Sequence, residues 1–222
     1  MEDFERKIID RIVGLSGKYS PYNIFSDWVE CCALAICNRC HLIHNNVWKD
    51  REKLYMDISG RYEPKEQEAF AEMFVWLTYA LEQDMSDVLG SIYMKAGLGS
   101  KYTGQFFTPF HLSELCARLN LENLKPDHDG VYRLHEPSCG AGGMIIAACK
   151  VLKDKGINYQ QKVDVVAQDL DWKGVYMTYL QLSLIGVNAL VVQGDTLAEP
   201  YEKGKTPRSR IMETPMKMGC LI

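Results

Sequence analysis

The sequence lacks any apolar run long enough to cross a membrane, so we predict that the chain does not span one. Its first residues, MEDFERK, are polar and acidic and contain nothing like the apolar core of a secretory signal. The eight cysteines are therefore predicted to be reduced thiols of a cytoplasmic protein, not disulfides. With a net charge of −4, the chain also lacks the basic excess that strong, unaided binding to nucleic-acid phosphates requires.

The sequence has no internal repeat and no low-complexity segment, and no two of its eight prolines are adjacent. It does have a change of pattern near residue 100. Before that point apolar residues recur at helical spacing, beginning with Phe4 and Ile8. Helices are expected over 4–15, from a cap at Ser26, over 47–56, from Pro64 and over 88–93. We predict a helical N-terminal domain over 1–100 and a second domain over 101–222.

A group of cysteines and histidines in the helical part raises the question of a metal site. The spacing of Cys37, Cys40, His41 and His44 would place all of them on one face of a continuous helix. A tetrahedral zinc site normally takes its ligands from more than one backbone segment. We therefore favour buried thiols beside two histidines at a helix end, and predict no metal. Cys37-x-x-Cys40-His41 also has the letters of a haem attachment motif, but nothing indicates an exported protein.

The glycine-rich segment GLGSKYTG (97–104) separates the two predicted domains and is expected to act as a hinge. In the QFFTP motif that follows, Thr108 can cap a helix whose first turn contains Pro109. One interpretation is simply a capped helix with Phe106 and Phe107 in the core. The other is that a phenylalanine packs on a ligand ring while the Thr108 hydroxyl binds a polar group. The apolar face of this helix is predicted to comprise Leu112, Leu115, Cys116 and Leu119.

The second domain is organised around the stretch VYRLHEPSCGAGGM (131–144), where a strand ends at Glu136 and a helix begins near Met144. Open α/β sheets bind ligands at the carboxyl ends of their strands. The glycines between strand and helix allow the backbone to approach a ligand, and the helix start offers free N–H groups to an anion. Glu136 suits a ligand that also carries a cation. The stretch predicts a nucleotide-type pocket with both signs of charge.

Two further strands are expected over 163–167 and 190–193, with a helix over 175–185 between them. The order β-α-β-α-β implies parallel strands joined by right-handed crossovers. The carboxyl ends of the three strands should then lie side by side. Glu136, Asp169 and Asp195 are the acids at those ends.

An acid after the second strand commonly accepts hydrogen bonds from a ribose diol, which would allow NAD. However, the turn GAGGMI (140–145) has no third glycine where a dinucleotide fingerprint needs one. A pyrophosphate would also lie beside the Glu136 carboxylate. S-adenosylmethionine fits better, because its sulfonium and amino groups are cationic and its carboxylate can use the helix start.

The motifs GQFFTP, HEPSCGAGGM, AQDLD and GDTL follow one another in this order. With DVLGSIY upstream, they resemble the adenine-N6 DNA methyltransferases, especially the modification subunits of type I restriction-modification systems, over roughly 87–197. The resemblance implies an α/β, Rossmann-like methyltransferase fold with a partial parallel sheet behind a helical N-terminal domain. It also implies S-adenosylmethionine as the cofactor and DNA as a partner, contacted through other subunits.

By resemblance, the QFFTP residues border the cofactor and the loop from Glu136 to Gly142 holds its methionine side. Asp169 holds the ribose, and Asp195 meets the adenine. The predicted cofactor-binding residues are Phe107, Thr108, Pro109, Glu136, Ser138, Cys139, Gly140, Gly142, Asp169, Leu170, Asp195 and Thr196.

The catalytic motif of that family, Asp or Asn followed by Pro-Pro and an aromatic residue, is absent from this sequence. In the family it holds the target amino group and stacks on the flipped-out base. No catalytic residue is therefore predicted here. One hypothesis is a fragment, split subunit or minimal methyltransferase that needs another polypeptide for catalysis. The alternative is a catalytically inactive, cofactor-binding accessory or regulatory subunit.

The strand over 131–135 would be central in the methyltransferase fold, flanked by the second strand and by a fourth. Because few residues follow Asp195, we expect no normal fourth strand, and one side of 131–135 is expected to lie open. An unpaired strand edge invites pairing with another chain. We expect residues 216–222, or the same surface of a second copy or another subunit, to cover it. Their removal should then cause aggregation or a change in oligomeric state.

Overall fold

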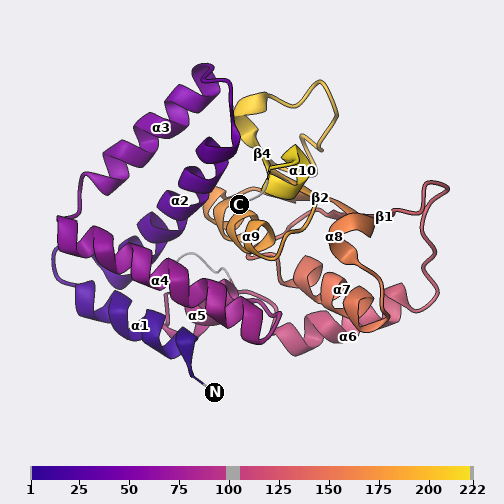
Figure 1. Ribbon diagram of the computed structural model, residues 1–222, viewed down its shortest axis with the longest axis horizontal. Helices are drawn as coiled ribbons and strands as arrows, with labels where there is room; N and C mark the ends of the chain where they lie inside the picture. Colours follow the sequence, from indigo (N-terminus) through magenta and orange to yellow (C-terminus); the bar gives the residue numbers. More distant parts are fainter. Residues whose placement is uncertain (1, 99–105, 221–222) are drawn as a thin grey trace.

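A computed structural model describes residues 2–98 and 106–220 of the chain, which form a helical half and a sheet half (Figure 1). The helical half comprises α1 (Phe4–Leu15), α2 (Pro21–Cys40), α3 (Asn46–Ser59), α4 (Pro64–Gln83) and α5 (Val88–Lys95). The sheet half comprises α6 (Phe110–Leu121), β1 (Tyr132–Glu136), α7 (Gly143–Asp154), α8 (Tyr159–Lys162), β2 (Val163–Asp169), α9 (Trp172–Leu184), β3 (Ala189–Gln193), the short 3₁₀ helix η1 (Arg208–Arg210), β4 (Ile211–Glu213) and α10 (Pro215–Met218). None of the helices in these ranges is both long and apolar enough to cross a membrane.

The order of helices and strands predicted from the sequence is confirmed, with two corrections near helix starts. α2 begins at Pro21 and not near Ser26, because the Ser20 hydroxyl caps it by accepting from Asn23 N at 3.2 Å. Proline suits the first turn, where its missing N–H would have no partner anyway. At α6, Pro109 occupies the cap position and no side chain caps the helix, so the predicted Thr108 cap is wrong.

α2 ends at Cys40, so the cysteines and histidines of the helical half do not share one helical face. His41 Nδ1 lies 2.8 Å from the Cys37 carbonyl oxygen, and His44 stacks on Trp48 with ring centroids 3.8 Å apart. The Cys37 thiol accepts a hydrogen bond from Arg51 at 3.2 Å. Within the described ranges, no three His, Cys, Asp or Glu side chains are grouped to hold a metal ion. The glycine hinge predicted over 97–104 lies largely outside those ranges.

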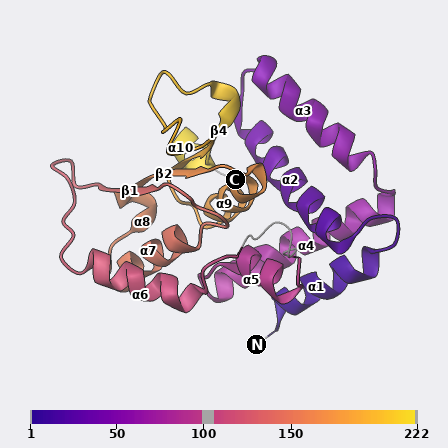
Figure 2. The same ribbon diagram turned by 180° about the vertical axis from the view of Figure 1, so that it is seen from behind.

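The sheet has the strand order β1-β2-β3-β4, in which β1 to β3 are parallel and β4 is antiparallel to β3. The register pairs Glu136 with Ala167 and Asp169 with Gln193, so the carboxyl ends of the parallel strands lie at one edge. This confirms the α/β class and the parallel β-α-β-α-β order. α9 lies between the sheet and α2 in both views (Figures 1 and 2). One cluster of buried apolar side chains runs through both halves. The division of the chain into two domains at residue 100 stays a prediction.

α6 turns a different face inward from the one predicted. Ser113, Ala117 and Leu121 are buried against the neighbouring α7, whereas the predicted apolar face is exposed. The exposed residues of that face are Leu112, Leu115, Cys116 and Leu119. Small residues such as Ser113 and Ala117 allow two helices to approach closely. The prediction considered only the spacing of the apolar residues and therefore placed the wrong face of α6 inward.

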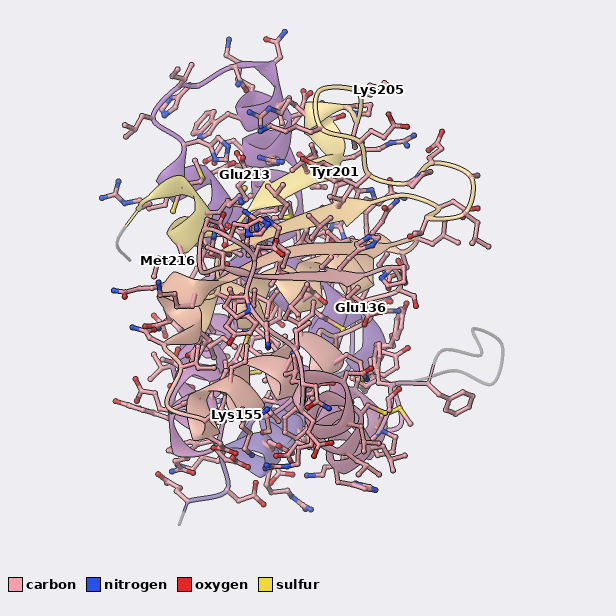
Figure 3. All side chains as sticks on the ribbon, turned by 90° about the vertical axis from the view of Figure 1, so that its right-hand side faces the viewer. Glu136, Lys155, Tyr201, Lys205, Glu213 and Met216 are labelled. Carbon is pink, nitrogen blue, oxygen red and sulfur yellow. The ribbon has the colours of Figure 1, made fainter. Side chains whose placement is uncertain are left out.

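Up to residue 220, the C-terminal segment does not cover the edge at β1 of its own chain, so that alternative is wrong, whereas coverage by a second copy or another subunit stays a prediction. β4 pairs with β3 at the other edge of the sheet, and α10 contacts α2 and β3. Figure 3 shows Glu136 and Met216 at opposite ends of the sheet. Among the described strands, β1 pairs only with β2, which leaves its outer edge unpaired.

Thr214 joins this segment to the sheet, and replacing it with valine should lower stability. Its side chain is fully buried, donates to the Val187 carbonyl at 2.7 Å and accepts from Ala189 N at 3.0 Å. Valine keeps the shape but leaves both backbone groups without this partner, which costs about 1–3 kcal/mol. Urea unfolding measures the change. Thr206→Val, at an exposed turn, is the control, and equal midpoints for the two variants would contradict the prediction.

Candidate functional site

A cavity of about 320 Å³ opens at the carboxyl ends of β1 and β2. It lies where the helical half, the start of α6 and the glycine loop (residues 137–143) meet. The predicted residues that line it are Phe107, Thr108, Ser138, Cys139, Gly140 and Asp169. The other described lining residues are Asp87, Phe106, Ser113, Ala141, Gly143 and Met144. The described lining therefore contains two carboxylates, and neither lysine nor arginine is among these residues.

The glycine loop follows β1 and needs its glycines for two different reasons. Gly140 has a φ of +53°, and a Cβ at this position would lie 3.0 Å from the ring of Phe107. Gly142 has a φ of +94° and begins α7, and a Cβ there would lie 3.2 Å from the Thr178 hydroxyl. Side chains at either position would be strained and crowded. The loop backbone is consequently free to form part of the cavity wall.

Asp169, at the end of β2, holds the glycine loop in place. Its Oδ2 accepts a hydrogen bond from Gly140 N at 2.7 Å, and its Oδ1 accepts one from Asp171 N at 2.9 Å. Gly174 on α9 makes room for this carboxylate, since a Cβ there would lie 3.0 Å from Asp169 Cγ. A carboxylate has about four acceptor positions, so Asp169 can also accept from the hydroxyls of a ligand.

Glu136 ends β1 but is not among the residues that line the cavity. Its Oε1 accepts a hydrogen bond from Ser138 N at 3.2 Å. Burial, with a smaller contribution from the charge of Asp169, raises the pKa of the Glu136 carboxyl above its usual value. Glu136 is thus a further acid next to the lining residue Ser138 and not itself part of the cavity wall.

The remaining predicted residues are not among those that line the cavity. The Thr196 hydroxyl donates to the Pro137 carbonyl at 2.5 Å and so joins the loop after β3 to the loop after β1. Asp195 Oδ1 accepts from Leu197 N at 2.9 Å, and the side chain of Leu170 is 68% exposed. The structure brings the three strand ends together as predicted. The predicted residues outside the cavity wall are Pro109, Glu136, Gly142, Leu170, Asp195 and Thr196.

The two phenylalanines of the QFFTP motif have different positions. Phe107 packs edge-on against Tyr93 of α5 with ring centroids 5.1 Å apart, which ties the motif to the helical half. Phe106 also lines the cavity, and 77% of its surface is exposed. Phe107 is therefore a wall residue held by packing, and Phe106 is free to contact a ligand.

Cys139 lines the cavity but is unsuited to nucleophilic chemistry. Burial, together with the charges of Asp169 and Glu136, raises the pKa of its thiol to about 12. A thiol with that pKa is neutral near pH 7, and only the thiolate is a good nucleophile. Cys139 can contribute packing and shape to the site.

Sequence reasoning did not identify Asp87, Ser113 or Gln181 as site residues. Asp87 caps α5 by accepting from Gly90 N at 2.9 Å, and it also accepts from Gln181 Nε2 at 2.8 Å. Gln181 Nε2 donates to the Ala141 carbonyl as well, at 2.7 Å. The DVLG motif predicts a capped helix, but it contains no signal that the cap lies at a cavity.

A second cavity is larger, with a volume of about 480 Å³. Residues of α2, α3 and the start of α9 line it, including Tyr22, Glu30, Arg51 and Trp172. None of the predicted cofactor-binding residues is among its described lining residues. We place the candidate site at the smaller cavity, because the glycine loop and Asp169 converge there.

The sequence model of the family described as N-6 DNA Methylase matches residues 84–216. The structure is similar to that of the methyltransferase subunit of a type I restriction-modification system from Streptococcus thermophilus. The TM-score is 0.48 and the sequence identity is 18%, over 86% of this chain and 43% of that one. This chain therefore spans less than half the length of that solved protein.

Proposed function

Because the chain belongs to the N-6 DNA methylase family, we propose that it binds S-adenosylmethionine and serves in adenine-N6 methylation of DNA within a restriction-modification system. The observation that carries the proposal is the pairing of a glycine loop with two cavity carboxylates, Asp87 and Asp169. Such a cavity favours a ligand with cationic groups and a ribose diol. It disfavours a pyrophosphate, since neither lysine nor arginine is among the described lining residues.

The residues present fit S-adenosylmethionine in size and chemistry. A cavity of about 320 Å³ lies at the lower end of the range for small-molecule sites. Asp169 would accept hydrogen bonds from the ribose hydroxyls, and the aromatic QFFTP residues would pack on the cofactor. When bound, the cofactor supplies the methyl group. The adenine contact assigned to Asp195, and the roles of Pro109, Leu170 and Thr196, remain proposals.

The target adenine of the DNA would be held by residues outside this sequence. The sequence contains no adjacent prolines and therefore no Pro-Pro motif. The unpaired outer edge of β1 is one surface on which a further strand, from a second copy or another subunit, could pair. The same missing motif favours a second candidate function, a cofactor-binding accessory subunit without catalysis. An assembly that binds cofactor stably but transfers no methyl group to nucleic acid would support this second candidate.

Calorimetric titration of the purified chain tests the proposed cofactor. We expect binding of S-adenosylmethionine and of its product, S-adenosylhomocysteine, and no binding of NAD or ATP at the same concentrations. NAD or ATP binding without S-adenosylmethionine binding would overturn the proposal. Injection of cofactor into buffer alone gives the heat of dilution for each ligand.

The purified chain by itself is expected not to methylate adenine in DNA, because the residues that hold the target base are missing. Tritium transfer from labelled cofactor to unmethylated plasmid measures this, with an intact adenine methyltransferase as the positive control. Transfer above background would show that other residues of this chain hold the base. Activity that appears only when a second polypeptide is added would distinguish a split enzyme from an accessory subunit.

A further inference from the structure

Asp87 is a nearly buried carboxylate, with 6% of its surface exposed, and it lines the same cavity as Asp169. The hydrogen bonds from Gly90 N and Gln181 Nε2 both go to its Oδ1. Its Oδ2 points toward the amino end of α7, where a Cβ on Gly143 would lie 3.0 Å from it. One oxygen thus fixes the side chain in place while the other faces the glycine loop.

Keeping this carboxylate buried has a free-energy cost. Burial raises the pKa of Asp87, although hydrogen bonds from Gln181 and Gly90 oppose that shift. The positive end of the α7 dipole lies beside Oδ2 and partly balances the charge. Capping α5 does not require a charge, since asparagine is an equally good cap. A buried carboxylate, where the cap alone would need only an amide, therefore fits a cationic ligand group, which would stabilise its charged form.

Ser113 is an independent sign of a ligand at the same place. This α6 residue is fully buried and lines the cavity, and its hydroxyl has no hydrogen-bond partner in the described part of the chain. Buried hydroxyls are nearly always hydrogen-bonded in folded proteins. A serine left without a partner at a cavity wall indicates that a ligand group completes its hydrogen bonding.

We propose that Asp87 and Ser113 bind the α-amino-acid group of S-adenosylmethionine, an inference that rests on the proposed function. Asp87 accepts hydrogen bonds from the ammonium group, and the Ser113 hydroxyl donates to the carboxylate. Two parts of the cofactor then contact two different carboxylates, the ribose at Asp169 and the amino-acid group at Asp87. This moves the ammonium contact from Glu136, which lies outside the cavity lining, to a residue inside it.

Calorimetry with two thioether ligands tests the assignment on the full chain. S-adenosylhomocysteine carries the α-amino-acid group, whereas 5′-methylthioadenosine lacks it. Asp87→Asn keeps an oxygen for the α5 cap and removes the charge. We expect it to weaken S-adenosylhomocysteine binding about ten- to hundredfold, as for loss of a hydrogen bond to a charged group, and to change methylthioadenosine binding less than about twofold. Asp84→Asn, which removes an exposed carboxylate three residues earlier, is the matched control.

Ser113→Ala tests the proposal if Asp87→Asn fails to fold. Alanine removes a buried hydroxyl without a protein partner, so the melting temperature should stay the same or rise. Binding of S-adenosylhomocysteine should still weaken by about three- to tenfold, the loss expected for one hydrogen bond. A purely structural serine would not produce this combination.

Several results would contradict the assignment of Asp87 and Ser113 and still leave S-adenosylmethionine as the proposed cofactor. Wild-type affinity for S-adenosylhomocysteine in a folded Asp87→Asn variant is one, and an equal loss for both ligands is another, because it would indicate a structural role only. If Asp87→Asn does not fold, unchanged binding by Ser113→Ala overturns it. If the wild-type chain binds neither S-adenosylmethionine nor S-adenosylhomocysteine, the proposed cofactor itself is wrong and the assignment falls with it.

Discussion

Asp169→Ala should weaken S-adenosylmethionine binding by about ten- to hundredfold, the effect of losing hydrogen bonds between a carboxylate and the ribose hydroxyls. The structure adds a second reason for a large effect. Asp169 also accepts from Gly140 N at 2.7 Å and from Asp171 N at 2.9 Å, so the variant loosens the glycine loop that forms the cavity wall. Calorimetry measures the dissociation constant directly.

The control for this experiment lies on the same strand. Asp164 is near the amino end of β2, where its carboxylate forms an ion pair with Lys217 at 2.6 Å. Asp164→Ala removes an acid of the same kind far from the cavity, so it should leave the dissociation constant unchanged. An unchanged constant in Asp169→Ala would exclude Asp169 from the binding site. Equal weakening in both variants would indicate a general loss of folding.

Gln181→Leu should destabilise the fold by about 3 kcal/mol or more, because it leaves several buried polar groups without their partner. Gln181 is fully buried on α9. Its Oε1 accepts from Leu89 N at 3.1 Å, and its Nε2 donates to Asp87 and to the Ala141 carbonyl. One side chain thus connects α5, the glycine loop and α9. Urea unfolding followed by circular dichroism measures the change.

Gln193→Leu is the matched control for Gln181→Leu. Gln193 Nε2 also donates to a backbone carbonyl, that of Leu170, at 2.9 Å, but this bond is exposed to solvent. Water can replace it, so its loss should cost well under about 1 kcal/mol. Similar unfolding midpoints for the two leucine variants would show that Gln181 does not connect the two halves of the chain.

The part of the fold that repeats a local pattern could be predicted from the sequence. Apolar runs that end in an acid or a glycine predicted β1, β2 and β3, and the alternation with helices predicted their parallel order. The short β4 and α10 were missed, because a strand of three residues contains too little periodicity to recognise. Residues 216–222 were expected at the β1 edge, but the C-terminal segment packs at the β3 edge. The edge that such a segment occupies depends on tertiary packing, which its own sequence does not specify.

Some residues of the candidate site could likewise be predicted from the sequence, and others could not. Gly140, Asp169, Phe107 and Thr108 were predicted from short local motifs, and the structure places all four in the wall of one cavity. Their roles toward a cofactor stay predictions. Asp87 was missed because its local signal is that of an ordinary helix cap. Ser113 was missed because its face of α6 was expected to be the polar one.

The sequence by itself determined the order of helices and parallel strands, the acids and glycines at the strand ends, and the absence of a Pro-Pro motif. These features depend on residues close together along the chain, whose spacing sets backbone conformation and chain direction. Only the tertiary structure decided which face of α6 is buried, which edge β4 occupies and where the Asp87 carboxylate points. Those outcomes depend on packing between segments far apart in sequence, such as Asp87 and Gln181. The free energies that select among such packings come from shape and hydrogen-bond complementarity, which no local pattern of residues records.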